Sequence, residues 1–522
     1  MSNMPKPTVA SNVSRAKVSK SVMKQSPLSR KASGVHKNSA SPTPGRKGEQ
    51  TACRMWTAFS SSSITDVSTF FNGSGRLFGF RTVDTHPKKG YTGPQNKNHA
   101  VFARQKGTFV ENFNELLKKY ADFIVRVGVN PQPGQTLIIN CSLEAAPLAR
   151  LCVRSAYEAG ARDVQVNWKD NTVSRTQMEL GSEEALCDNK PWQLRRYLDY
   201  AESEGGVCVL HLIADDPEVY AGLDGAKISR VNAAARKFMA PWREYTMNDK
   251  VQWSIAAMPS APWAKKMFPE LDTAAAIEKL WQLIFDVCRV TGGDPVNEWK
   301  AHLDRLMTLR DKMNAFDLES VHFKSSNGTD LTVGLADKAS WESAGSKNEK
   351  GVDFLPNIPT EEVFTAPHKD KVDGIVYGTK PYVFNGQLIK GFHVTFKDGK
   401  VIEHGAEEGA DLLGQLLDTD EGSRHIGEVA LVPASSPINR SGALFYSTLF
   451  DENAACHIAF GASYPGTTAD GTSLSKEELL ARGMNQSAIH EDVMIGAEDS
   501  EITGKCRDGR TVELFKNGIW VL

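Results

Sequence analysis

The chain has 522 residues, of which 40% are hydrophobic and 24% are charged, with 61 Lys and Arg against 63 Asp and Glu. This composition is typical of globular proteins, the length favours more than one domain, and the net charge of -2 argues against a chain built wholly for polyanions. The charge is uneven, however. Residues 1–110 hold 18 Lys and Arg against three acids, a net +15, which leaves -17 for residues 111–522. We therefore expect the N-terminal segment to have a role different from that of the rest.

Residues 1–108 form a basic extension. Residues 1–48 contain no acid, ten Lys and Arg, ten Ser and five Pro. Such a segment buries too little apolar surface to offset its ordering entropy, so we expect it to be largely disordered. Its composition also resembles an organellar transit peptide or a basic arm that binds a polyanion, although the early prolines disfavour a transit-peptide helix. Residues 49–108 have the composition of a linker.

Location is indicated by what the sequence lacks. No apolar run reaches the roughly 20 residues that a membrane helix needs, and no apolar stretch follows the N-terminus as in a secretory signal. The eight cysteines form no C-x-x-C pair and lie mostly in apolar runs, which is typical of buried thiols in a reducing compartment. We expect a cytoplasmic protein without membrane contact, with a mitochondrial or other organellar location through the basic extension as the alternative.

Residues 109–315 are predicted to form an α/β domain. Helical spacing covers residues 112–127, and residues 136–140 and 163–168 are apolar strands around a helix at 143–160. Strand, helix and strand within about 33 residues make a βαβ unit, which implies a parallel sheet with a right-handed crossover. Further predicted elements are a strand at 207–213 and helices at 228–239, 272–290 and 295–313, the last with Asp294 as N-cap.

Short strands then replace helices, which predicts a strand-rich mixed domain over residues 316–522. Asn327-Gly328 between two apolar runs predicts a hairpin with a type I′ turn. The fold class is thus an α/β domain with a parallel sheet followed by a strand-rich mixed α+β domain. Its other predicted strands lie at 361–365, 372–377, 392–397, 400–404 and 428–432, with a final hairpin at 511–522.

Candidate metal ligands gather in this second domain, and the sequence holds no P-loop, G-x-S-x-G or H-E-x-x-H motif. In a strand over 489–495, His490 and Asp492 point to one face and Glu491 to the other. An imidazole and a carboxylate two residues apart on one face can reach the same metal. The alternative interpretation is a half-exposed polar face.

Other candidates are weaker when taken singly. Glu428 leads into an apolar strand, where a buried carboxylate must be paired or metal-bound, although it could simply end the strand. Strand alternation turns one of Glu361 and Glu362 inward without indicating which, and adjacent acids are usually solvated. His457 lies among small and apolar residues, as a hydrogen-bonded core histidine also would, and Tyr464 could be a packed loop residue.

Two histidines and at least three carboxylates from one domain suit borderline divalent metals such as Zn, Co or Mn. This set exceeds what one zinc ion needs. A two-metal site is therefore predicted, with one carboxylate free to handle a proton of water.

Several longer motifs occur in this domain in a fixed order. They are Asn357-Ile-Pro-Thr-Glu-Glu-Val-Phe-Thr-Ala-Pro367, Leu416-Leu-Asp-Thr-Asp-Glu-Gly422, Gly427-Glu-Val-Ala-Leu-Val-Pro433, Leu449-Phe-Asp-Glu-Asn-Ala-Ala455 and Met494-Ile-Gly496. In these motifs the sequence resembles the thermophilic aminopeptidases of the T/S type, a dinuclear metallo-aminopeptidase family. The match runs from about residue 109 to the C-terminus and leaves residues 1–108 outside.

The resemblance implies roles for individual residues. Glu428 would also act as the general base on the water between the metals, and Tyr464 would stabilise the oxyanion of the tetrahedral intermediate. Glu362 is preferred over Glu361 because its distance from Glu428 along the chain is closer to the family's spacing. The implied metal ligands are Glu362, Glu428, His457, His490 and Asp492. Family members form homodimers whose sites face an interior cavity, which would limit substrates to peptides.

We therefore predict a metal-dependent aminopeptidase that removes N-terminal residues from peptides, with two divalent ions as cofactors and no nucleic-acid partner. One alternative is a non-catalytic scaffold or binding protein of the same fold, recruited by its basic arm. The other is a metal-dependent amidase that acts on non-peptide amides.

Overall fold

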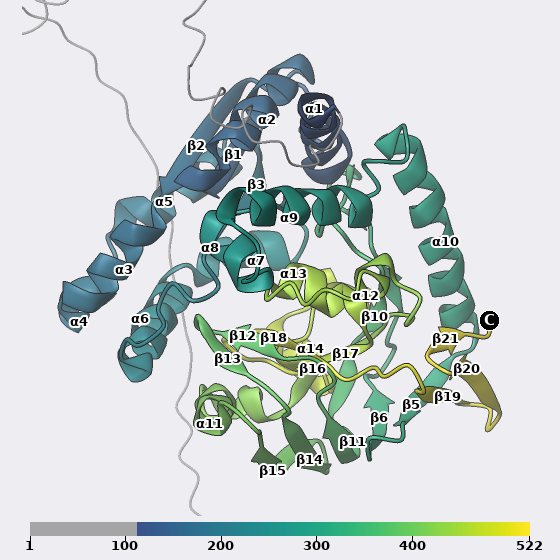
Figure 1. Cartoon of the computed structure of the whole chain (residues 1–522). Helices are drawn as coiled ribbons and strands as arrows, with labels where there is room; N and C mark the ends of the chain where they lie inside the picture. The colour runs from purple at the N-terminus through teal and green to yellow at the C-terminus, as the bar shows by residue number, and fades with distance from the viewer. Residues whose placement is uncertain (1–111) are drawn as a thin grey trace, which may run out of the picture. The chain divides into compact units, whose positions relative to one another are not determined.

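The structure is a computed structural model that describes residues 112–522. The predictions made for residues 1–108 lie outside this range. The described residues begin with a parallel sheet and its helices and continue into antiparallel sheets (Figure 1). The predicted fold class is therefore confirmed. The change from one kind of sheet to the other falls between α10 (Pro295–Ala315) and β5 (Leu318–Lys324).

The first sheet is parallel throughout and has the strand order β2-β1-β3-β4. Its central strands β1 and β3 are almost wholly buried, whereas β2 lies at an edge and is half-exposed. Continuous apolar runs are what a strand buried on both faces requires, which is why these strands were predictable. The bounds are β1 (Thr136–Ser142), β2 (Asp163–Lys169), β3 (Val207–Ile213) and β4 (Trp253–Ala257).

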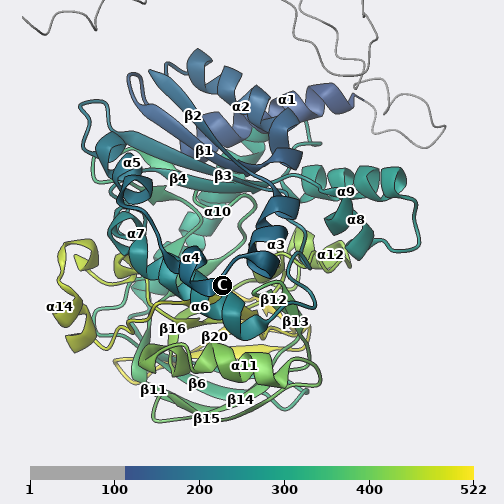
Figure 2. The ribbon, with the colours of Figure 1, turned by 90° about the vertical axis from the view of Figure 1, so that its left-hand side faces the viewer.

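Helices cover this sheet (Figures 1 and 2). The predicted helix at 112–127 is α1 continued by a π-helix at Ile124–Val129, and the one at 143–160 begins with a 3-10 turn at Leu143–Ala145. The helices are α1 (Phe113–Phe123), α2 (Ala146–Glu158), α3 (Asn171–Leu180), α4 (Glu183–Cys187), α5 (Pro191–Ala201), α6 (Gly225–Phe238), α7 (Ala240–Met247), α8 (Ala261–Met267), α9 (Thr273–Val287) and α10.

Capping side chains explain where several of these helices begin. Asp294 accepts a hydrogen bond from the backbone of Val296 at 3.0 Å, so the predicted N-cap of α10 is confirmed. Helices α3 to α5, which were not predicted, lie between β2 and β3 and bury few residues. Their apolar residues do recur at helical spacing, and those of α5 pack partly buried against Trp242.

Two antiparallel sheets make up the rest, and the stacking of Phe396 on Phe460 shows that they face each other. The larger sheet consists, in spatial order, of β15 (Lys400–Gly405), β14 (His393–Lys397), β11 (Pro367–Tyr377), β6 (Asp330–Leu335), β5, β19 (Glu501–Cys506), β20 (Thr511–Lys516) and β21 (Ile519–Trp520). The smaller sheet consists of β18 (His490–Met494), β17 (His457–Gly461), β16 (Ile426–Leu431), β10 (Val363–Thr365) and β7 (Glu342–Ser343).

Minor elements connect these sheets. The two-stranded ladders are β12 (Tyr382–Phe384) with β13 (Gln387–Ile389) and β8 (Ser346–Lys347) with β9 (Asp353–Phe354). The helices are α11 (Ala410–Leu417), α12 (Pro437–Arg440), α13 (Thr448–Asp451) and α14 (Lys476–Ala481). In the part of the chain that the structure describes, no helix combines the length and apolarity needed to cross a bilayer.

The type I′ turn predicted at Asn327-Gly328 is wrong. Such a turn needs a positive φ at both central residues, and here only Gly328 has one (φ 102°). The Asn327 side chain instead accepts hydrogen bonds from Ser325 and from the backbone of Thr329, which builds a longer loop. At the last hairpin, both Asn517 (φ 49°) and Gly518 (φ 69°) have positive φ, as type I′ requires.

Candidate metal centre

Three neighbouring strands of the smaller sheet carry most of the predicted site. In the ladder, Glu428 of β16 pairs with Ala459 of β17, which in turn pairs with Asp492 of β18. His457 and His490 each lie two residues from this row, so their side chains share its face. The predicted one-sided placement of His490 and Asp492 thus follows directly from strand periodicity.

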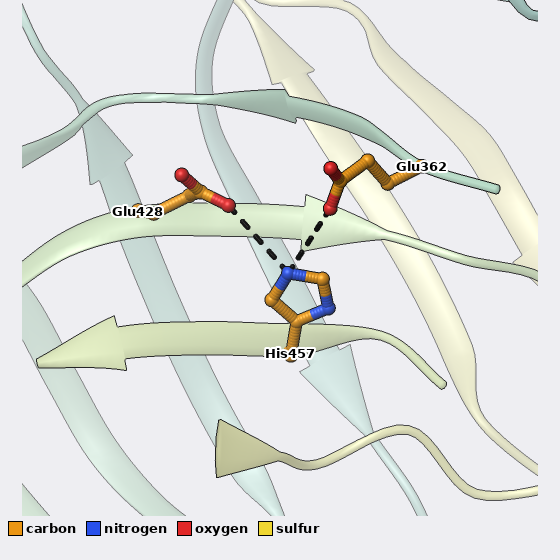
Figure 3. Close-up of side chains that lie close together, drawn as sticks. All are labelled: Glu362, Glu428 and His457. Carbon is orange, nitrogen blue, oxygen red and sulfur yellow. Dashed lines mark ion pairs between the residues drawn. The ribbon is translucent and has the colours of Figure 1, made fainter. Parts of the chain in front are cut away.

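Glu362 also belongs to this group. It immediately precedes β10, the strand next to β16 in the sheet. Its Oε2 lies 3.2 Å from Nε2 of His457, and Oε1 of Glu428 lies 3.5 Å from the same nitrogen. Figure 3 shows both carboxylates directed at that nitrogen. One ligand atom from each of these three residues falls within 4.8 Å of the others, a spacing that a single metal ion can span.

A second group of three lies next to the first and shares Glu428 with it. Nε2 of His490 lies 3.6 Å from Oε2 of Glu428 and 3.5 Å from Oδ1 of Asp492. The two oxygens of Glu428 therefore face different groups, one the imidazole of His457 and the other that of His490.

Backbone carbonyls orient both imidazoles. Nδ1 of His457 lies 3.2 Å from the carbonyl oxygen of Ala455, and Nδ1 of His490 lies 2.7 Å from that of Ala462. A carbonyl oxygen can only accept, so each Nδ1 carries the proton. In the neutral ring, Nε2 then presents its lone pair to the carboxylates, which is the arrangement found in metal-binding histidines.

The donor set fits a divalent cation. Glu428 and His457 are buried, and Oδ1 of Asp492 is buried without a hydrogen-bond partner. Carboxylates withdrawn from water are costly unless a positive charge neutralises them, and a carboxylate oxygen without a hydrogen-bond partner beside two imidazoles has the chemistry of a metal ligand. Glu362, Glu428, His457, His490 and Asp492 are the residues that could hold the metal.

Electrostatics point the same way. Burial alone would lower the pKa of His490, but the charges of Asp492 and Glu428 outweigh it and raise that pKa to about 9. Burial would likewise lower the pKa of His457, whereas its bonds to Glu362 and Glu428 raise it well above its usual value. The site thus attracts positive charge, which protons or metal ions can supply in competition.

Tyr464 lies over this face of the sheet. Its ring meets the His490 ring edge-on at 4.7 Å and the Phe364 ring at 6.4 Å between centroids. Burial, together with the negative charges of Glu428 and Asp492, raises the pKa of Tyr464 well above its usual value. The phenol therefore keeps its proton at neutral pH and can act as a hydrogen-bond donor.

The structure places Glu362 in the cluster and Glu361 outside it. The predicted strand at 361–365 begins only at Val363, because the Glu361 N–H donates to the side chain of Asn453 instead of a strand. The expectation that one of the two acids is inward is also wrong, since both are buried. Glu361 turns away to form an ion pair with Arg289 at 2.5 Å.

Glu452 was not predicted and lies beside the cluster. It is buried, accepts a hydrogen bond from Asn453 at 3.2 Å, and has a pKa raised well above its usual value by burial and by the charges of Asp492 and Glu362. The sequence did contain a signal, because Asp451 and Glu452 interrupt a stretch of apolar and small residues. Asp451 accepts hydrogen bonds from the backbone N–H groups of Phe445 and Ser447, which leaves Glu452 as the acid beside the cluster.

Comparisons with known proteins identify the family of this chain. The thermophilic metalloprotease family (M29) matches residues 113–520. Aminopeptidase 2 of Geobacillus stearothermophilus is 44% identical over 79% of this chain and 99% of its own length, and aminopeptidase AmpS of Bacillus subtilis (strain 168) is 41% identical over 79% and 100%. The structure of wild-type AmpT from Thermus thermophilus superposes with a TM-score of 0.72 at 36% identity, covering 78% of this chain and all of that one. The predicted resemblance is thereby confirmed, and the chain belongs to the thermophilic metalloprotease family M29.

Proposed function

We propose that this protein is an aminopeptidase that removes N-terminal residues from peptides with the help of two divalent ions, Zn, Co or Mn. The observation that carries the proposal is the pair of ligand groups that share Glu428. The names of its relatives, all aminopeptidases, support the reaction class. When bound, such ions lower the pKa of water and polarise the scissile carbonyl.

The residues of this chain divide the remaining work. Glu362 and His457 would hold one ion and His490 and Asp492 the other, and Glu428 belongs to both ligand groups. Glu428 also accepts the proton of the attacking water and passes it to the leaving amine. The Tyr464 hydroxyl donates a hydrogen bond to the oxygen that becomes negative as the amide carbonyl is attacked.

The substitution Glu428→Gln tests this division. It keeps the side-chain shape and one metal-binding oxygen but removes the proton acceptor, so turnover of an aminoacyl-nitroanilide should fall by about 10²- to 10⁴-fold. Because Gln keeps only one of the two oxygens that face the ligand groups, metal content by elemental analysis should fall to no less than one ion per chain. Glu319→Gln is the matched control, because Glu319 is a surface residue paired with Lys505. Wild-type turnover in the Glu428 variant would refute the assigned role.

Removal of metal separates this function from the alternatives. A scaffold protein would bind no metal and show no chelator-sensitive activity, and an amidase would act weakly on a panel of peptides. Reloading the chelated protein with Zn, Co or Mn identifies the preferred ion. The homodimer is part of the proposal and is tested by light scattering on the purified chain. So is the cytoplasmic location, which is tested by following a variant that lacks residues 1–48.

A further inference from the structure

Arg289 has an unusual backbone position at the end of α9. The Val290 N–H donates to the backbone carbonyl of Phe285 at 2.7 Å, and the Arg289 N–H donates to the backbone carbonyl of Asp286 at 3.0 Å. This is the pattern of a Schellman motif. The residue in the position of Arg289 adopts a left-handed conformation, here with φ 55°, and is usually glycine because other side chains are strained there. The side chain at this strained position is that of an arginine, and it contacts three other side chains.

That side chain makes a buried ion pair. Its guanidinium donates to Oε1 of Glu361 at 2.5 Å and to Nδ1 of His302 at 3.3 Å, and it lies over the ring of Trp299 at 5.1 Å. The Arg289 side chain is 17% exposed and that of Glu361 7% exposed. Three neighbours thus fix the direction of the guanidinium, and Glu361 receives an oriented, partly desolvated partner.

His302 of α10 extends the network to the backbone. Burial and the charge of Arg289 lower the pKa of His302 to about 3, so the ring is neutral. Because Nδ1 accepts from Arg289, Nε2 carries the proton and donates it to the carbonyl of Thr360 at 2.9 Å. The Thr360 carbonyl is therefore held by His302, and the Glu361 side chain is held by Arg289.

Asn453 holds the same segment from the other side. Its Oδ1 accepts from the backbone of Glu361 at 2.7 Å, and its Nδ2 donates to the carbonyls of Pro359 and Leu449. The next residue along the chain is Glu362, whose carboxylate reaches His457. The backbone that leads to Glu362 is thus held by Arg289 and His302 on one side and by Asn453 on the other.

We propose that Arg289 is a positioning residue for the metal centre: by holding Glu361, it fixes the backbone from which Glu362 reaches the metal. The inference rests on the proposed function, since it takes Glu362 as a ligand. A buried ion pair is by itself weak evidence for a stabilising role, because desolvation offsets much of the attraction. Partners that orient a ligand typically change metal affinity by 10- to 100-fold when they are removed.

The experiment measures the Zn²⁺ dissociation constant of the full-length protein by competition with a fluorescent chelator, together with the melting temperature of the metal-free form. Arg289→Met should weaken Zn²⁺ binding by about 10- to 100-fold. Arg289→Lys, which restores the charge, should recover part of the loss. Glu361→Gln keeps the side-chain shape and should weaken binding in the same direction by a smaller factor.

Arg175→Met is the matched control. Arg175 lies on α3 and donates to the carbonyl oxygens of Val219 and Ala221, and that segment carries no candidate ligand. It should lower the melting temperature and leave the Zn²⁺ dissociation constant unchanged. Wild-type Zn²⁺ affinity in Arg289→Met would overturn the inference; if that variant does not fold, wild-type affinity in Glu361→Gln would do so. A wild-type protein that binds no metal would instead refute the proposed function.

Discussion

At the residue scale, a substitution at Tyr464 can distinguish an effect on metal or substrate binding from an effect on catalysis. Its ring packs against His490 and Phe364, and its hydroxyl is the only part that the proposed chemistry uses. Tyr464→Phe keeps the ring contacts and removes the donor, so kcat should fall by about 10²- to 10³-fold, as for other oxyanion donors. Metal content and KM should stay near their wild-type values. Steady-state kinetics on a peptide substrate check this, and an unchanged kcat would exclude the hydroxyl from catalysis.

At the element scale, the site depends on an irregularity in the ladder between β16 and β17. The register shifts between Ile426 and Glu428, and a Cβ on Gly427 would lie 2.3 Å from the carbonyl oxygen of Ala462. Gly427→Ala should therefore push β16 away from β17 and displace Glu428, lowering both the melting temperature and the metal content. Gly345→Ala, where the nearest atom is 3.9 Å away, is the control and should change neither. Full metal content in Gly427→Ala would contradict this account.

Individual strands differ in how well the sequence alone predicts them. Buried strands such as β1 and β3 were predictable from continuous apolar runs, and β18 from the alternation of His490, Glu491 and Asp492. Strand β17 was not predicted, because its five residues begin with His457 and end with Gly461 and so give neither alternation nor an apolar run as long as those of β1 and β3. Periodicity could not choose Glu362 over Glu361 either. The Glu361 N–H bonds to the side chain of Asn453, 92 residues away, so the strand begins only at Val363. Such long-range contacts leave no local signal.

At the scale of the whole molecule, the proposed chemistry lies entirely in the acidic part of the chain. The family match covers residues 113–520, and the relatives are matched over nearly their whole length. A chain that starts at residue 109 should therefore keep the kcat/KM of the full-length protein towards peptides, since every proposed ligand and Tyr464 lie within the residues that the family matches. Kinetics on the two purified proteins measure this, and a tenfold loss would assign the extension a part in activity.

The row of paired residues across β16, β17 and β18 has one more consequence. Adjacent strands in any sheet lie about 4.8 Å apart, because backbone hydrogen bonds set that separation. Ligands that project from neighbouring strands inherit this spacing before any cation arrives. The separation of the Cα atoms that carry these side chains is then dictated by the peptide backbone and not by the flexibility of side chains. Exchanging one metal for another of different radius would leave the frame in place and alter only the final bond lengths.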